Sequence, residues 1–134
     1  IRYPGKAGVQ IAFDEPLAHK IIASSDLFLM PSRYEPSGLT QIYSLRYGTI
    51  PIVRTTGGLK DTVEQFDPRT GKGNGFVFGR YEAQDLLEAV EQALSLFHQK
   101  VNWATLMKNA MLADFSWKCY AQAYIDLYQK LVTG

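Results

Sequence analysis

Met30-Pro-Ser-Arg-Tyr-Glu-Pro-Ser-Gly-Leu-Thr-Gln41 decides the fold, because an apolar run stops here and a loop leads into a helix. The apolar run Leu27–Met30 has the character of a short strand. Two prolines then disfavour a helical conformation for the residues that precede them. Residues 31–37 are therefore expected to form a loop, and this loop carries a single carboxylate, that of Glu35.

The apolar residues that follow this loop recur at helical spacing. From Gly38 onward they fall on one face of a helix, which Gly48 ends, at Leu39, Ile42, Tyr43 and Tyr47. The helix N-terminus is thus expected at the carboxyl end of a strand. In an open parallel sheet ligands bind at that edge, and the unpaired amides of a first helical turn favour an anion.

The rest of the chain alternates between strand and helix signals. The elements expected before the last strand are a strand at 8–13, a helix capped by Asp14 and running to about Ser24, a strand at 49–54, a short helix at 59–65 and a loop at 67–75. A strand at 76–78 and three helices follow, with apolar stripes within 86–97, 103–111 and 120–131, the last capped by Ser116. This order predicts an α/β fold with a parallel sheet of about four strands, flanking helices and a helical C-terminus.

Composition excludes several classes of function. The 134 residues are 46% hydrophobic, enough for the core of one domain, and the net charge of +1 offers no basic stripe for nucleic acid. No apolar run approaches the roughly 18 residues that a membrane span requires. A single cysteine, Cys119, excludes an internal disulfide and favours a cytoplasmic setting, and His19 and His98 are too far apart in the sequence to suggest zinc.

Glu35 is the strongest candidate for a chemical role. A surface glutamate is usually only solvated, but this one precedes a helix N-terminus and has a proline on one side of it and another at the start of its loop. Ser37 and Gly38 have two interpretations, a helix cap or an anion site, which use the same amides. Residues 55–58 are most simply a turn, yet they would lie beside the first loop if the two strands are neighbours. The glycines of the 67–75 loop precede a strand, so we interpret them as loop residues rather than a phosphate cradle.

Further motifs accompany residues 31–41, and they are Leu45-Arg-Tyr-Gly48, Pro51, Arg54-Thr-Thr-Gly-Gly-Leu59, Asp61-Thr-Val63 and Gly75-Phe-Val-Phe78. In this combination the chain resembles bacterial glycogen synthases and plant starch synthases, from about Tyr3 to Tyr128. These relatives are retaining glycosyltransferases of the GT-B type, in which two Rossmann-like domains face one cleft. They transfer glucose from ADP-glucose to the non-reducing end of an α-1,4-glucan.

The resemblance implies that residues 1–134 are a single domain, a fragment of the C-terminal, donor-nucleotide-binding domain with a partial Rossmann-like sheet. ADP-glucose and an α-1,4-glucan are then the expected partners, without metal or cofactor, in the cytoplasm or in a plastid if the source is a plant. The sequence begins with isoleucine and no leader follows, so we expect an N-terminal domain of the same protein upstream. The fragment alone is expected to be inactive.

Site residues follow from the resemblance by matching position. Glu35 corresponds to the carboxylate beside the donor glucose, where it stabilises positive charge at the sugar, and Phe13 to an aromatic residue that stacks on adenine. The phosphates, ribose and sugar would lie against Ser37, Gly38, Leu39, Thr40, Thr56, Gly57 and Gly58. Ser37 replaces a cysteine found in many relatives, and Tyr43 stands where the wider superfamily places a second glutamate, as in the glycogen synthases.

Two other functions remain open on the sequence alone. The domain could be a non-catalytic nucleotide- or glucan-binding module, and the sequence upstream of Ile1 would distinguish this from an enzyme. A doubly wound signalling or flavin domain is a weaker interpretation, because no acidic phosphorylation pocket or flavin loop is apparent. The choice between ADP-glucose and UDP-glucose is also open.

The predicted sheet is incomplete under this resemblance. In the parent strand order 3-2-1-4-5-6, the strand at Val9–Phe13 has lost the strands between it and Leu27–Met30. We expect it to pair with the Leu27–Met30 edge or with another copy of the chain, because buried unpaired backbone groups are costly. The apolar stripe of the last helix should also lack cover, so the fragment is expected to self-associate; its members are Tyr120, Tyr124, Leu127, Tyr128 and Leu131.

Overall fold

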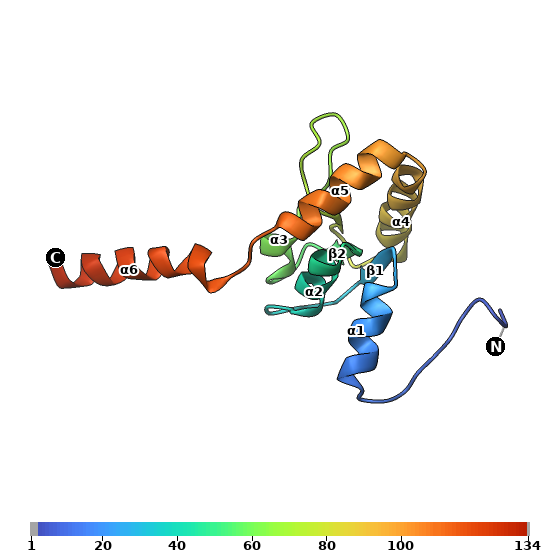
Figure 1. Ribbon diagram of the computed structural model, residues 1–134, viewed down its shortest axis with the longest axis horizontal. Helices are drawn as coiled ribbons and strands as arrows, with labels where there is room; N and C mark the ends of the chain where they lie inside the picture. Colours follow the sequence, from blue (N-terminus) through green and yellow to red (C-terminus); the bar gives the residue numbers. More distant parts are fainter. Residues whose placement is uncertain (1–2, 134) are drawn as a thin grey trace.

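The computed structural model describes residues 3–133, which form nine helices and strands in this described part of the chain (Figure 1). In chain order these are α1 Glu15–Ala23, β1 Leu27–Met30, α2 Thr40–Tyr47, β2 Ile50–Arg54, α3 Leu59–Thr62, β3 Phe76–Phe78, α4 Ala83–Phe97, α5 Lys100–Leu112 and α6 Trp117–Thr133. The predicted α/β class is confirmed. Each predicted helix is present, and β1 and β3 have the predicted bounds.

The sheet is parallel throughout, with the order β1-β2-β3. Leu27 pairs with Ile50 across the first ladder, and Ile52 pairs with Phe76 across the second. The central strand β2 is buried along almost its whole length. Because all three strands run the same way, the loops that follow β1 and β2 emerge at the same edge of the sheet.

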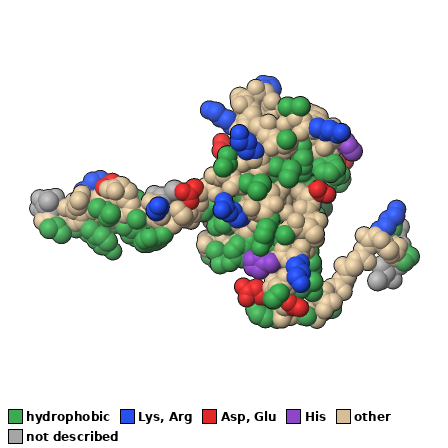
Figure 2. Space-filling view, viewed as in Figure 1, with side chains coloured by type: hydrophobic (Ala, Val, Ile, Leu, Met, Phe, Trp, Pro, Cys, Tyr) green, Lys and Arg blue, Asp and Glu red, His purple; other side chains and the backbone are tan. Residues whose placement is uncertain are grey.

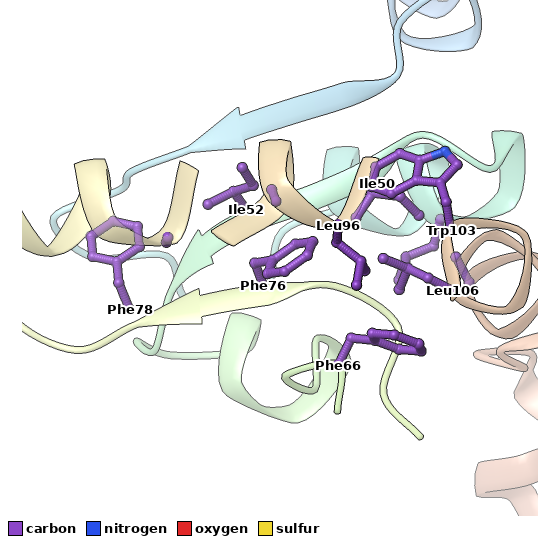
Figure 3. Packing of buried hydrophobic residues seen from close by; sticks show 12 residues of the cluster. Ile50, Ile52, Phe66, Phe76, Phe78, Leu96, Trp103 and Leu106 are labelled. Atoms are coloured by element: carbon purple, nitrogen blue, oxygen red, sulfur yellow. The ribbon is translucent and has the colours of Figure 1, made fainter. Parts of the chain in front are cut away.

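One face of the sheet packs against α4 and α5. Figure 3 shows Ile50, Ile52 and Phe76 pointing toward side chains that these helices contribute, among them Leu96 and Leu106. A smaller cluster on the other face joins Val53 of β2 to residues of and after α3, Leu59 and Val63. The alternation of β2 between these clusters is the two-residue period expected of a strand covered on both sides.

Residues 8–13 do not form the predicted strand, so the described sheet has three strands rather than four. The segment is extended and lies away from the sheet in Figure 1, and it does not pair with β1. Its alternating apolar side chains are exposed, with Phe13 at 103%. The alternation expresses a preference for strand, but a strand also needs a partner edge, which this segment does not have.

Helix α6 projects from the rest of the molecule (Figure 1), and hydrophobic side chains gather along one side of it in Figure 2. Every member of the predicted stripe, from Tyr120 to Leu131, is exposed. A continuous exposed apolar face along a helix is unusual on the surface of a monomer and marks a contact surface.

We expect the chain of residues 1–134 to self-associate through this helix, so its apparent mass in light scattering should rise with concentration. Leu127→Lys places a charge in the stripe and should reduce the association. Val101→Lys, at an exposed apolar residue on α5, gives the same change of charge elsewhere and should leave association unchanged. A strict monomer at every concentration, with freely exchanging amides at Val9–Phe13, would show that neither exposed surface drives association.

Candidate functional site

The loop from Pro31 to Leu39 connects the carboxyl end of β1 to α2, as predicted. Helix α2 begins at Thr40, two residues later than predicted, and ends at Tyr47, after which Gly48 takes the left-handed conformation with a φ of 77°. Its N-cap position is Leu39, and no side chain caps the helix, so Ser37 is not a side-chain cap. The amides of the first turn are thereby left without a side-chain acceptor, which suits an anion.

The loop Pro31–Leu39, here called the Glu35 loop, is in direct backbone contact with the turn Thr56–Gly58 after β2, here called the glycine turn. The amide of Gly58 donates a hydrogen bond to the carbonyl oxygen of Glu35, at 3.1 Å. A Cβ at Gly57 would lie 1.7 Å from that same oxygen, and a Cβ at Gly58 would lie 2.5 Å from the carbonyl oxygen of Ser37. Both positions therefore require glycine, and the expectation that the two loops lie together is met because β1 and β2 are neighbours.

Gln41, which was not selected from the sequence, binds the backbone of the Glu35 loop at Ser37 and Gly38. It is fully buried, and its Nε2 donates to the carbonyl oxygens of Ser37 and Gly38, at 3.2 and 2.9 Å. A Cβ at Gly38 would lie 2.4 Å from Gln41 Oε1, and Gly38 has a φ of 73°. Packing and conformation therefore both require glycine at position 38.

The buried face of α2 differs from the apolar face that the sequence suggested. The buried residues are Gln41, Ser44 and Leu45, whereas Leu39 and Tyr47 are exposed. Gln41 Nε2 donates to carbonyl groups of the loop and Ser44 Oγ donates to the carbonyl oxygen of Gln41, whereas the buried Gln41 Oε1 has no hydrogen-bond partner in the described part of the chain. Because polar side chains occupy this buried face, the apolar periodicity is misleading.

A cavity of about 330 Å³ lies beside the start of α2, between it and α1. Phe13, His19, Thr40 and Tyr43 are among its lining residues. The imidazole of His19 packs on the Tyr43 ring at a centroid distance of 4.8 Å, which makes one wall aromatic. Phe13 is thus brought to the same cavity as Thr40, the first residue of α2.

A larger cavity, of about 510 Å³, lies elsewhere, between α4 and the segment that precedes β3. We place the site at the carboxyl edge of the sheet instead, because the glycine contacts and the uncapped helix converge there. The 67–75 loop precedes β3, as predicted, and Asn109 of α5 anchors it by donating to the carbonyl oxygens of Gly71 and Gly73 at 2.7 and 2.9 Å.

The candidate site residues fall into two groups. Backbone contact joins Glu35 and Ser37 to the glycine turn Thr56–Gly58, and Gly38 and Leu39 lead from this group into α2. Phe13 and Thr40 line the neighbouring cavity. Within residues 3–133 no three histidine, cysteine or acidic side chains are grouped as metal ligands would be. In the same range no helix has the length and apolar character of a membrane span.

Comparisons with known proteins show which proteins this chain is similar to. The sequence profile of the family described as "Glycosyl transferases group 1" matches residues 6–105. A glycogen synthase from Koribacter versatilis is 57% identical over 129 residues, and one from Desulforamulus reducens is 51% identical over 131 residues. These alignments cover 96% and 98% of this chain, which spans 27% of the length of either relative. The catalytic domain of starch synthase IV from Arabidopsis thaliana, solved with ADP and acarbose, superimposes with a TM-score of 0.81 at 41% identity, over 92% of this chain and 26% of that one.

Proposed function

Because the chain belongs to the group 1 glycosyl transferases, we propose that it is part of the donor-nucleotide-binding domain of a glycogen or starch synthase. The proposed reaction transfers glucose from ADP-glucose to the non-reducing end of an α-1,4-glucan with retention of configuration. The identities of the relatives support this assignment, as does the presence of ADP and acarbose in the starch synthase structure. A cytoplasmic location, or a plastid in a plant, is part of the proposal.

The contact between Gly58 and Glu35 is the observation that carries the proposal. It joins the backbone of Glu35, which bears the only carboxylate of the loop, to the turn Thr56–Gly58, at the sheet edge where α2 begins. A carboxylate borne on backbone that is held in this way can face the positive charge that develops on a glycosyl group with little reorganisation of the loop during the reaction. The amides of Gly38, Leu39 and Thr40 are the proposed ligands of the distal phosphate and ribose, in keeping with an uncapped helix start.

The adenine is proposed to occupy the cavity shared by Phe13 and Thr40. An aromatic wall suits a purine, which gains stacking and dispersion energy against a ring. The exposed ring of Phe13 would be covered by the base. The acceptor glucan is proposed to bind to an N-terminal domain of the same protein, and the basic residues that neutralise the diphosphate are proposed to lie in sequence that precedes Ile1.

The test is a transfer assay on the complete protein that contains this chain. Incubation with ADP-glucose and maltopentaose should yield maltohexaose with a new α-1,4 linkage, detected by NMR of the anomeric proton. A parallel reaction with UDP-glucose identifies the preferred donor. Nucleotide binding without transfer from either donor would contradict the proposal and favour the non-catalytic binding module.

The chain of residues 1–134 alone is expected to bind ADP only weakly and to transfer no glucose. A dissociation constant of about 1 mM corresponds to roughly 4 kcal/mol, whereas 1 μM would require about 8 kcal/mol from half of a cleft. Calorimetry with ADP measures this affinity directly, and amide shifts at Gly38–Gln41 and Thr56–Gly58 would localise the binding. Micromolar affinity would show that the missing domain is not needed for the nucleotide.

A further inference from the structure

Arg54 connects three segments at the carboxyl edge of the sheet. It is the last residue of β2 and is half-buried. Its Nη1 donates to the carbonyl oxygen of Arg33 at 2.5 Å, and its Nε donates to the carbonyl oxygen of Gly79 at 3.1 Å. Its guanidinium carbon lies 5.6 Å from the centre of the Tyr81 ring. One side chain thus ties the loop after β1 to the segment after β3.

The segment after β3 is itself held in place. The backbone amide of Arg80 donates to Asp85 Oδ2 at 3.1 Å, and the Arg80 guanidinium pairs with Asp85 Oδ1 at 2.7 Å. These hydrogen bonds hold the pKa of the Asp85 carboxyl below its usual value. The Arg80 amide and the Gly79 carbonyl belong to the same peptide group. Because that amide is bound by Asp85, in the first turn of α4, the Gly79 carbonyl is held in place as an acceptor for Arg54.

The other end of Arg54 acts on the loop that carries Glu35. The Arg33 carbonyl precedes Glu35 by two residues, and the Glu35 carbonyl is bound by Gly58. Two hydrogen bonds from β2 and the turn that follows it therefore fix the backbone on both sides of Tyr34. We propose that Arg54 is a positioning residue, which aims the Glu35 carboxylate at the donor sugar by holding the backbone that bears it. This inference rests on the proposed function.

The geometry favours positioning over direct binding of an anion. Two nitrogens of the guanidinium, Nε and Nη1, already donate to carbonyl oxygens, and none of the ion pairs found within residues 3–133 includes Arg54. Only arginine has donors in a rigid fork that reaches two carbonyls at once, whereas lysine offers a compact charge on a flexible stem. A positioning role therefore depends on the fork, and an anion-binding role would depend on the charge.

Steady-state kinetics of Arg54→Lys and Arg54→Gln in the complete protein distinguish the two roles. We expect kcat to fall about 10- to 100-fold in both variants, since small displacements of a catalytic group have effects of this size. The KM for the donor should stay within about twofold, because ground-state binding is not the target. Arg46→Gln is the matched control: Arg46 also donates to a backbone carbonyl, that of Met111, away from the loop, and kcat should not change. A normal kcat in Arg54→Lys, or a raised KM at normal kcat, would overturn the inference.

A double-mutant cycle with Glu35→Gln supplies the decisive readout. If Arg54 acts through Glu35, adding Arg54→Gln to Glu35→Gln should lower kcat by less than about threefold, because coupled residues are not additive. If the loss of kcat in the double variant equals the product of the losses in the two single variants, Arg54 acts independently of Glu35. That result would refute its positioning role. Normal turnover in Glu35→Gln itself would remove Glu35 from the mechanism and with it the positioning role of Arg54, whereas absence of transfer by the unsubstituted protein would refute the proposed function. Thermal unfolding of each variant confirms that the kinetic effects come from folded protein, and Arg54→Lys carries the test if Arg54→Gln does not fold.

Discussion

Replacing Glu35 with glutamine in the complete enzyme is expected to lower turnover by at least about 100-fold while the affinity for ADP hardly changes. The amide keeps the size of the side chain but removes the negative charge that would stabilise a developing glycosyl cation. Because that cation exists only in the transition state, the loss of the negative charge should reduce kcat more than it changes ground-state binding.

The measurement combines a transfer assay with a calorimetric titration of ADP. Glu91→Gln is a suitable control, since it removes one carboxylate from an exposed position on α4. Turnover of Glu35→Gln close to that of the unsubstituted enzyme would remove Glu35 from the mechanism.

Gly57→Ala is expected to cause a comparable loss of turnover and a loss of stability as well. The new Cβ would lie 1.7 Å from the Glu35 carbonyl oxygen, so the two loops would have to separate. Overpacking costs about 1–3 kcal/mol, and a left-handed φ, here 48°, costs an alanine about 1–2 kcal/mol more. Displacement of the Glu35 loop should lower kcat about 100-fold.

Gly71→Ala separates the effect of the steric clash from the effect of the left-handed backbone conformation. Gly71 also has a positive φ, of 68°, but the nearest atom to its Cβ would be Thr105 Cγ2 at an ordinary 3.6 Å. It should therefore show the backbone cost in a thermal unfolding experiment and retain normal turnover. Normal kcat in folded Gly57→Ala would show that the contact between the loops is not needed for catalysis.

The elements predicted correctly are those with local causes. The prolines of the Glu35 loop and Gly48 at the end of α2 act within a few residues, so their effects can be inferred from the sequence alone. Strand β3 was also predicted from a short local pattern, Phe76–Phe78. The glycine turn became informative only when β1 and β2 were taken as neighbours, which the parallel order β1-β2-β3 bears out.

The features missed or wrongly predicted depend on distant partners or on the conformation of a loop. The apolar alternation of residues 8–13 could not show that no strand would lie beside them. Arg54 binds a carbonyl group that is far away in the sequence. Gln41 binds carbonyl groups that are near in the sequence, but they lie in a loop whose conformation had to be known first. A signal existed for Gln41, because it lies four residues before buried Leu45 on the same helix face. For Arg54 the corresponding signal is a charged residue that ends a buried strand.

The central claim is that Glu35 faces a donor sugar whose phosphates lie at the start of α2. A crystal structure of the complete protein with ADP-glucose tests it most directly. We expect the Glu35 carboxylate beside the glucose ring, the distal phosphate on the amides of Gly38–Thr40 and the adenine against Phe13. Binding of the nucleotide in the cavity beside α4, with Glu35 remote from the sugar, would contradict this account.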